Sequence, residues 1–124
     1  MQPIATEDLR IKSVEGVLAP LQLHLEYPVS VQAAQTVHDS RNAIQNVLKR
    51  EDDRLVVIVG PCSIHDPQAA LEYAQRLAPI KRELAEDLLI VMRVYFEKPR
   101  TTVGWKGLIN DPKLDGSFEI NRGL

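Results

Sequence analysis

The sequence predicts an α/β fold built on a parallel sheet, and three neighbouring segments carry that prediction. Residues 55–59 form an unbroken aliphatic run, which is typical of a strand buried on both faces. Residues 88–96 are a second strand candidate, and the stretch between the two segments has apolar residues at helical spacing. A strand, a crossover helix and a second strand make a βαβ unit, in which the two strands lie parallel.

The N-terminal half precedes this unit with a leader and one helix. Residues 1–30 are punctuated by prolines and are interpreted as an N-terminal arm. Alternating apolar residues between positions 9 and 14 favour either a short strand or an extended arm. Residues 31–50 predict an amphipathic helix, for which Ser30 is a suitable N-cap.

The crossover helix is expected to begin after Asp66, because Asp66 is a good N-cap and Pro67 suits the first helical position. It is expected to continue to about residue 86. Pro79 lies within it and is expected to kink or divide the helix, since proline lacks the amide donor.

Residues 97–124 are rich in Gly, Pro, Lys, Asn and Asp, which predicts a long ordered loop. The beginning of another helix is expected over residues 117–124. The predicted organisation is therefore an arm over residues 1–30 and one domain over residues 31–124.

Composition narrows the classes of protein. The chain has 124 residues, 44% of them hydrophobic, as expected for about one globular domain. Its net charge is −2. This charge argues against a nucleic-acid partner, and the absence of a long apolar run argues against a membrane partner. The first residues lack the pattern of a secretory signal, and a single cysteine excludes an internal disulfide. A cytoplasmic location is expected.

Chemically reactive side chains follow the first predicted strand. Cys62 and His65 are suitable ligands for zinc, iron or a similar ion. A Cys-x-x-His pair alone is more often a small buried cysteine beside a turn, and a cysteine nucleophile is a further alternative.

A cationic cluster follows the second predicted strand. Between positions 93 and 106 the sequence has four cations and one acid: Arg93, Lys98, Arg100 and Lys106 against Glu97. Arginine, lysine and threonine side chains are typical phosphate ligands, so the cluster predicts a site for phosphorylated small molecules. The alternative is a solvated cationic loop.

Two long motifs in these loops resemble one family. Residues 60–67 read Gly-Pro-Cys-Ser-Ile-His-Asp-Pro, and residues 92–112 contain Arg-Val-Tyr-Phe-Glu-Lys-Pro-Arg-Thr-Thr-Val-Gly-Trp-Lys-Gly. Both closely resemble the class I 3-deoxy-D-arabino-heptulosonate-7-phosphate (DAHP) synthases of the bacterial type. Residues 7–12 and 53–55 also resemble that family, whereas Pro79 departs from it in a helix.

The resemblance implies a (β/α)₈ barrel, of which this chain is the N-terminal part, and a transferase activity. Such enzymes condense phosphoenolpyruvate with erythrose 4-phosphate, release phosphate, and begin the shikimate route to the aromatic amino acids. It implies that Cys62 is one ligand of a divalent metal, Mn²⁺ or Fe²⁺. It also implies that Arg93 and Lys98 contact phosphoenolpyruvate, with Lys98 as a catalytic residue. The erythrose 4-phosphate ligands that it implies are Lys98, Pro99, Arg100 and Thr101.

Three further expectations come from the resemblance. His65 is expected to orient the metal ligand Cys62, with a plain turn residue as the alternative. Asp8 and Ile11 are expected to lie near a pocket for an aromatic amino acid effector. A homo-oligomer is expected, because members of the family are dimers or tetramers.

Length sets one more expectation. A complete barrel needs about 250 residues, so the chain is expected to be the N-terminal portion of a synthase and to be inactive alone. The alternative is a non-catalytic remnant that binds phosphometabolites weakly or pairs with a full-length synthase.

Overall fold

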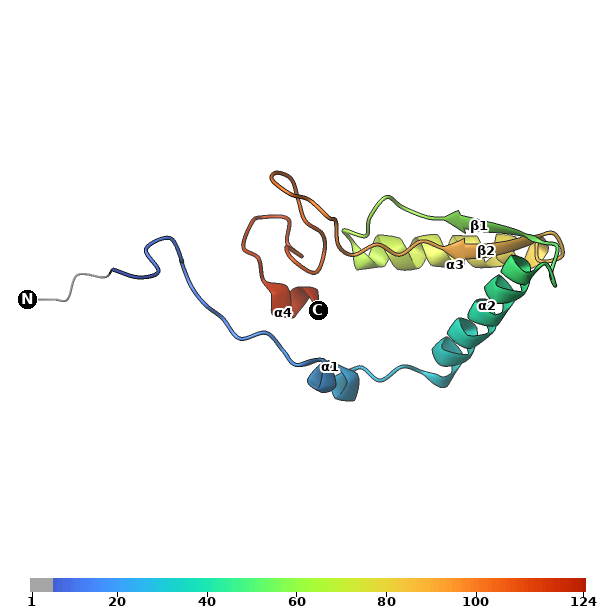
Figure 1. Cartoon of the computed structure of the whole chain (residues 1–124), viewed down its shortest axis with the longest axis horizontal. Helices are drawn as coiled ribbons and strands as arrows, with labels where there is room; N and C mark the ends of the chain where they lie inside the picture. The colour runs from blue at the N-terminus through green and yellow to red at the C-terminus, as the bar shows by residue number, and fades with distance from the viewer. Residues whose placement is uncertain (1–5) are drawn as a thin grey trace, which may run out of the picture.

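The computed structural model describes residues 6–124, so the first five residues of the predicted arm lie outside the described residues. The chain forms a βαβ unit, with a long leader before it and an irregular segment after it (Figure 1). The elements in chain order are α1 (Pro20–Glu26), α2 (Val31–Lys49), β1 (Leu55–Val59), α3 (Pro67–Glu83), β2 (Leu88–Met92) and α4 (Ile120–Gly123). In residues 6–124 no helix is both long enough and apolar enough to cross a membrane.

The two strands pair in parallel, as the sequence predicts. Leu55 pairs with Leu88 at one end of the ladder and Val59 pairs with Met92 at the other. Helix α3 lies along the sheet, whereas α2 leaves it at an angle and α1 lies apart (Figure 1). The sequence predictions of α/β class, parallel pairing and an intervening helix are therefore confirmed.

Capping residues at both long helices are also confirmed. The Ser30 hydroxyl accepts a hydrogen bond from the amide of Ala33, and the Asp66 carboxylate accepts one from Gln68. Of the two outcomes expected at Pro79, division of the helix is wrong, because α3 is continuous and ends at Glu83. Pro79 and the residue four positions before it are exposed, so water can satisfy the carbonyl that loses its amide partner.

Three other expectations differ from the structure. Strand β2 ends at Met92 rather than at residue 96, because β1, with which it pairs, ends at Val59, the partner of Met92. The leader has no strand between residues 9 and 14: Leu9 and Arg10 lie in a turn, closed by the Ile11 amide that donates to the Asp8 carbonyl at 3.0 Å, and the segment is exposed. Helix α1 was not predicted, and α4 forms only part of the helix expected over residues 117–124.

The core is small. Its buried hydrophobic side chains in the described part of the chain are Ile64, Leu89 and Ile90. Strand β1 is not buried on both faces as predicted, since Leu55 is 66% exposed and Ile58 is 70% exposed. With two strands and few covering elements, the sheet leaves much of its apolar surface in contact with solvent. An apolar cavity of about 490 Å³ lies between α3, the segment after β2 and the C-terminal residue Leu124.

One side chain connects the leader to the C-terminal segment. The Asn121 amide donates a hydrogen bond to the carbonyl of Gly16 at 2.9 Å and accepts one from the amide of Leu18 at 2.9 Å. This pairing imitates a β-bridge, because one amide side chain satisfies the donor and the acceptor on one edge of an extended chain. We name this Asn121–Gly16–Leu18 contact the arm clamp.

Replacing Asn121 with leucine is expected to open the arm clamp. Both hydrogen bonds are lost, and a net value of about 1 kcal/mol for each bond corresponds to a rise of about 30-fold in hydrogen exchange at the Leu18 amide. Exchange monitored by NMR measures this directly. The control is Asn42→Leu, which removes an exposed amide from α2 and is expected to leave Leu18 unchanged. Equal Leu18 exchange in Asn121→Leu and the unmodified chain would contradict the clamp.

Candidate active site

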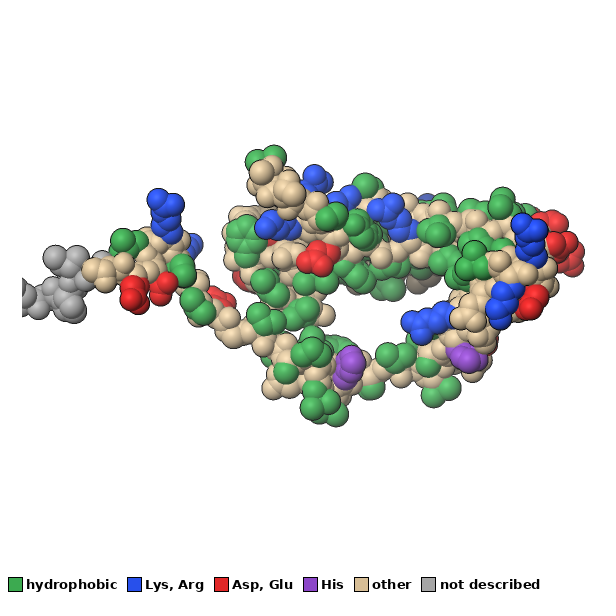
Figure 2. Space-filling view, viewed as in Figure 1, with side chains coloured by type: hydrophobic (Ala, Val, Ile, Leu, Met, Phe, Trp, Pro, Cys, Tyr) green, Lys and Arg blue, Asp and Glu red, His purple; other side chains and the backbone are tan. Residues whose placement is uncertain are grey.

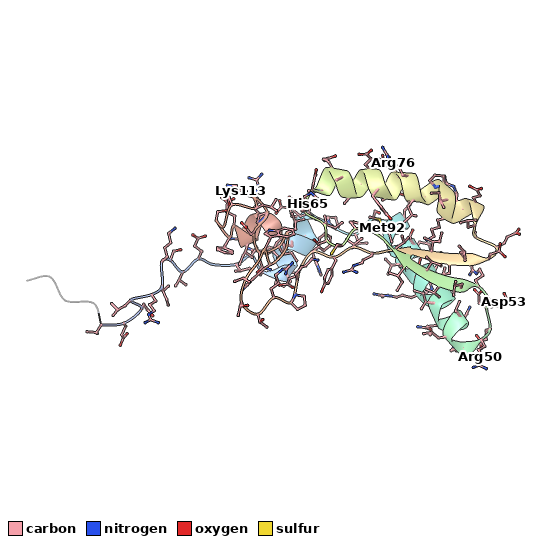
Figure 3. All side chains as sticks on the ribbon, turned by 90° about the horizontal axis from the view of Figure 1, so that it is seen from above. Arg50, Asp53, His65, Arg76, Met92 and Lys113 are labelled. Carbon is pink, nitrogen blue, oxygen red and sulfur yellow. The ribbon has the colours of Figure 1, made fainter. Side chains whose placement is uncertain are left out.

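The carboxyl ends of β1 and β2 place two loops side by side, at the same end of the βαβ unit. Met92 ends β2 and His65 precedes α3 at this end, whereas Arg50 and Asp53 lie at the opposite end (Figure 3). The amide of Arg93 donates to the carbonyl of Val59 at 2.8 Å, which extends the parallel ladder by one bond beyond Met92. Ligands of open parallel sheets collect at this end.

The first loop comes very close to the second. A Cβ atom on Gly60 would lie 2.6 Å from the carbonyl oxygen of Arg93, so only glycine fits there without a shift. The amide of Ile64 then donates to the carbonyl of Tyr95 at 2.9 Å. These contacts hold the Cys62 loop against the beginning of the cationic segment.

Three of the predicted site residues meet at Cys62. The Lys98 Nζ atom donates to the Cys62 Sγ atom at 2.9 Å, and an Arg93 guanidinium nitrogen donates to the Cys62 carbonyl at 3.2 Å. Cys62 is exposed, so the predicted alternative of a small buried cysteine is wrong. Arg93 is also exposed, because it lies just after the strand rather than inside it.

The surrounding cations favour the thiolate form of Cys62. The Lys98 ammonium is the main cause, through its hydrogen bond and its charge, and it holds the pKa of the thiol below its ordinary value. Desolvation opposes this shift, while the charges of Arg93 and Arg100 add to it. In the space-filling view, Lys and Arg side chains gather over this end of the molecule (Figure 2).

A two-sided loop presents Lys98. Glu97 and Gly107 form an antiparallel bridge, and the Lys98 amide donates to the Lys106 carbonyl at 2.6 Å. The Arg100 Nε atom donates to the carbonyl of Trp105 at 3.0 Å and so closes the loop from inside. Lys98 is half-buried, while the loop's other predicted site residues are exposed, namely Pro99, Arg100 and Thr101.

The remaining predicted residues are not brought to this centre. His65 is exposed at the start of α3, and in residues 6–124 its ring makes no hydrogen bond. Asp8 and Ile11 lie in the leader, which runs away from the body of the protein (Figure 1). Their expected roles stay predictions.

The described residues do not fit a divalent metal by themselves. Cys62 provides one soft donor, and residues 6–124 hold no group of three or more His, Cys, Asp or Glu side chains placed to bind an ion. Zinc centres, for example, take three or four protein ligands. The Sγ atom is instead hydrogen-bonded by Lys98.

The sequence pattern predicts only that Tyr95 continues a buried strand, and the structure places it at the site instead. The Arg93 guanidinium carbon lies 4.8 Å from the centroid of its ring, and the Lys98 Nζ atom lies 5.8 Å from it. The spacing Arg-x-Tyr-x-x-Lys, directly after an aliphatic run, is the signal in the sequence that could have revealed it.

Comparison with known proteins identifies the family. A phenylalanine-sensitive phospho-2-dehydro-3-deoxyheptonate aldolase from Escherichia coli (strain K12) is 60% identical over 118 residues, which are 95% of this chain and 34% of that protein. The phenylalanine-inhibited phospho-2-dehydro-3-deoxyheptonate aldolase from Saccharomyces cerevisiae is 52% identical over 118 residues, which are 95% of this chain and 32% of the yeast protein.

A solved structure gives the same result. The phospho-2-dehydro-3-deoxyheptonate aldolase of Francisella tularensis SCHU S4 superposes with a TM-score of 0.86 at 50% identity, over 91% of this chain and 33% of the other. The chain thus spans about a third of the length of these relatives. The model of the DAHP synthetase I family matches residues 26–124, and the chain belongs to that family.

Proposed function

We propose that this chain contributes substrate-binding residues to a 3-deoxy-7-phosphoheptulonate synthase, which condenses phosphoenolpyruvate with erythrose 4-phosphate. One observation carries the proposal: Arg93 and Lys98 converge on Cys62 at the carboxyl ends of two parallel strands. Neither cation pairs with a carboxylate among residues 6–124. Two phosphorylated substrates require fixed, unpaired cations of this kind.

The residues divide the work between the two substrates. Arg93 and Lys98 bind the anionic groups of phosphoenolpyruvate, and the run from Lys98 to Thr101, with Pro99 and Arg100 between them, binds erythrose 4-phosphate. In the reaction C3 of phosphoenolpyruvate bonds to the aldehyde carbon, water adds at C2 and phosphate leaves. The Lys98 ammonium serves both substrates and neutralises negative charge beside the reacting carbons, which makes it the catalytic residue of this part of the site.

The same proposal includes the larger architecture. We place β1, α3 and β2 as the beginning of a (β/α)₈ barrel domain that starts at residue 31, after an arm over residues 1–30. A Mn²⁺ or Fe²⁺ site at Cys62 then requires donors other than the described residues. The relatives include phenylalanine-, tyrosine- and tryptophan-sensitive enzymes, which supports an aromatic effector. We place its pocket near Asp8 and Ile11 and propose a homo-oligomer.

A chimera tests the proposed function. Residues 1–124 are joined to the remaining two thirds of the E. coli phenylalanine-sensitive enzyme, and phosphate release is measured with both substrates and Mn²⁺. The chimera is expected to be active, and Lys98→Ala within it is expected to lower kcat/KM by about 100-fold or more. The matched control is Arg76→Ala, which removes an exposed cation of α3 that pairs with Glu72. A folded but inactive chimera, or full activity in Lys98→Ala, would contradict the proposal.

The 124-residue chain alone is proposed to be inactive. Its described residues provide one metal donor, and its sheet has two strands with open edges. The same phosphate-release assay is expected to give no signal above the uncatalysed background. Turnover near that of a full-length synthase would overturn this part of the proposal.

A further inference from the structure

One aromatic ring is shared by the two cations nearest to Cys62. Both Arg93 and Lys98 lie within cation–π distance of the Tyr95 ring, at 4.8 Å and 5.8 Å from its centroid. The two cations also share Cys62, since Arg93 donates to its carbonyl and Lys98 to its sulfur. Tyr95 and Cys62 are therefore the two groups that both cations contact.

The position of the Tyr95 ring is set by the backbone. The carbonyl of Tyr95 accepts a hydrogen bond from the amide of Ile64, whose side chain is only 3% exposed. Two residues earlier in the chain, the amide of Arg93 donates a hydrogen bond to the carbonyl of Val59 at the end of β1. The ring is half-buried, so it has less freedom than the exposed Arg93 side chain beside it.

In the part of the chain that the structure describes, no acidic side chain holds Arg93 and Lys98 in place. Glu97 is the only acid between positions 93 and 106, and its carboxylate accepts a hydrogen bond from the Asn110 amide at 3.1 Å. Arg93 and Lys98 make no ion pair within the part of the chain that the structure describes. Two neighbouring cations repel each other, and the negative face of an aromatic ring attracts both without cancelling their charge.

We propose that Tyr95 is a positioning residue that holds Arg93 and Lys98 together beside Cys62 and so concentrates positive potential for an anionic substrate. A carboxylate in its place would fix the same two side chains but neutralise them. The ring fixes them and leaves their charge available to the ligand. The functional meaning of this inference rests on the function proposed above, whereas its physical content belongs to this chain alone.

The single cysteine provides a probe of that potential. Cys62 is the only thiol in the chain, so alkylation reports on this site alone. Iodoacetate is an anion and iodoacetamide is neutral, and both react with the same thiolate. The ratio of their second-order rate constants therefore cancels the thiolate fraction and measures the attraction of the site for an anion. Low ionic strength keeps the attraction unscreened.

Three variants separate the ring from its surroundings. Tyr95→Leu removes the ring and is expected to lower the iodoacetate-to-iodoacetamide ratio by about threefold. Tyr95→Phe keeps the ring and is expected to keep the ratio. Phe96→Leu, the control, removes the adjacent ring, which contacts neither cation, and is also expected to keep the ratio.

A double-mutant cycle excludes a merely structural effect. In a chain that already carries Arg93→Gln and Lys98→Gln, Tyr95→Leu is expected to leave the ratio unchanged, because the ring acts through these cations. An equal drop in this background, an unchanged ratio in Tyr95→Leu, or a drop in Tyr95→Phe as large as in Tyr95→Leu would overturn the inference. The measurement needs no substrate, so an inactive chimera combined with the expected ratios would refute the proposed function and leave the role of Tyr95 standing.

Discussion

Replacing Gly107 with alanine is expected to detach the loop that presents Lys98. Gly107 is buried at φ 126°, and an added Cβ would lie 2.2 Å from the Phe96 carbonyl oxygen and 2.7 Å from the Glu97 Cα atom. Backbone strain and this clash together cost about 2 kcal/mol or more. The Glu97–Gly107 bridge therefore opens, and the Lys98 amide, which donates to Lys106 across the loop, is expected to exchange about 30-fold faster.

Gly116 provides the matched control for this substitution. It also has a positive φ, of 74°, but an added Cβ would find no atom within 4 Å. Gly116→Ala thus introduces backbone strain without a clash, and Lys98 exchange is expected to stay as it is in the unmodified chain. Hydrogen exchange by NMR compares the two variants. Unchanged Lys98 exchange in Gly107→Ala would show that the loop does not depend on this close approach.

Replacing Lys98 with methionine is expected to make Cys62 much less reactive at neutral pH. The Lys98 ammonium lowers the pKa of the thiol, so in the unmodified chain the thiolate persists at pH values below the ordinary titration range of a cysteine. Without Lys98 the thiol keeps its proton to higher pH, and the midpoint of the pH–rate profile moves upward. Since the thiolate is the nucleophile, the rate at neutral pH falls several-fold.

Alkylation by iodoacetamide between pH 5 and pH 10 measures this profile. The control is Lys106→Met, because Lys106 contributes its carbonyl to the loop and its side chain does not contact the sulfur. Superimposed profiles for Lys98→Met and the unmodified chain would contradict the 2.9 Å contact.

The βαβ unit could be predicted from local patterns. The aliphatic run at 55–59, the Asp66–Pro67 helix start and the second run from 88 are each encoded within a few residues. The meeting of the Cys62 loop with Arg93 and Lys98 was also foreseeable, because parallel strands bring their carboxyl ends to one edge.

Other features depend on distant parts of the chain. The end of β2 at Met92 is decided by its partner β1, which ends at Val59, rather than by the apolar side chains that recur at positions 94–96. Helix α1 has seven residues and follows Ala19, whose methyl side chain cannot act as an N-cap. The Gln22 side chain instead accepts a hydrogen bond from the amide of Ala19. The position of the Tyr95 ring likewise depends on its hydrogen bond to Ile64.

The arm clamp also has a consequence for the order of folding. It joins residues 103 and 105 positions apart, and closing a flexible loop of that length costs about 4 kcal/mol. Two hydrogen bonds return about 2 kcal/mol, so the clamp cannot nucleate folding. It can form only once the βαβ unit and the cationic loop have already brought its ends together. The leader is thus the last part of the chain to dock and the first to leave on unfolding.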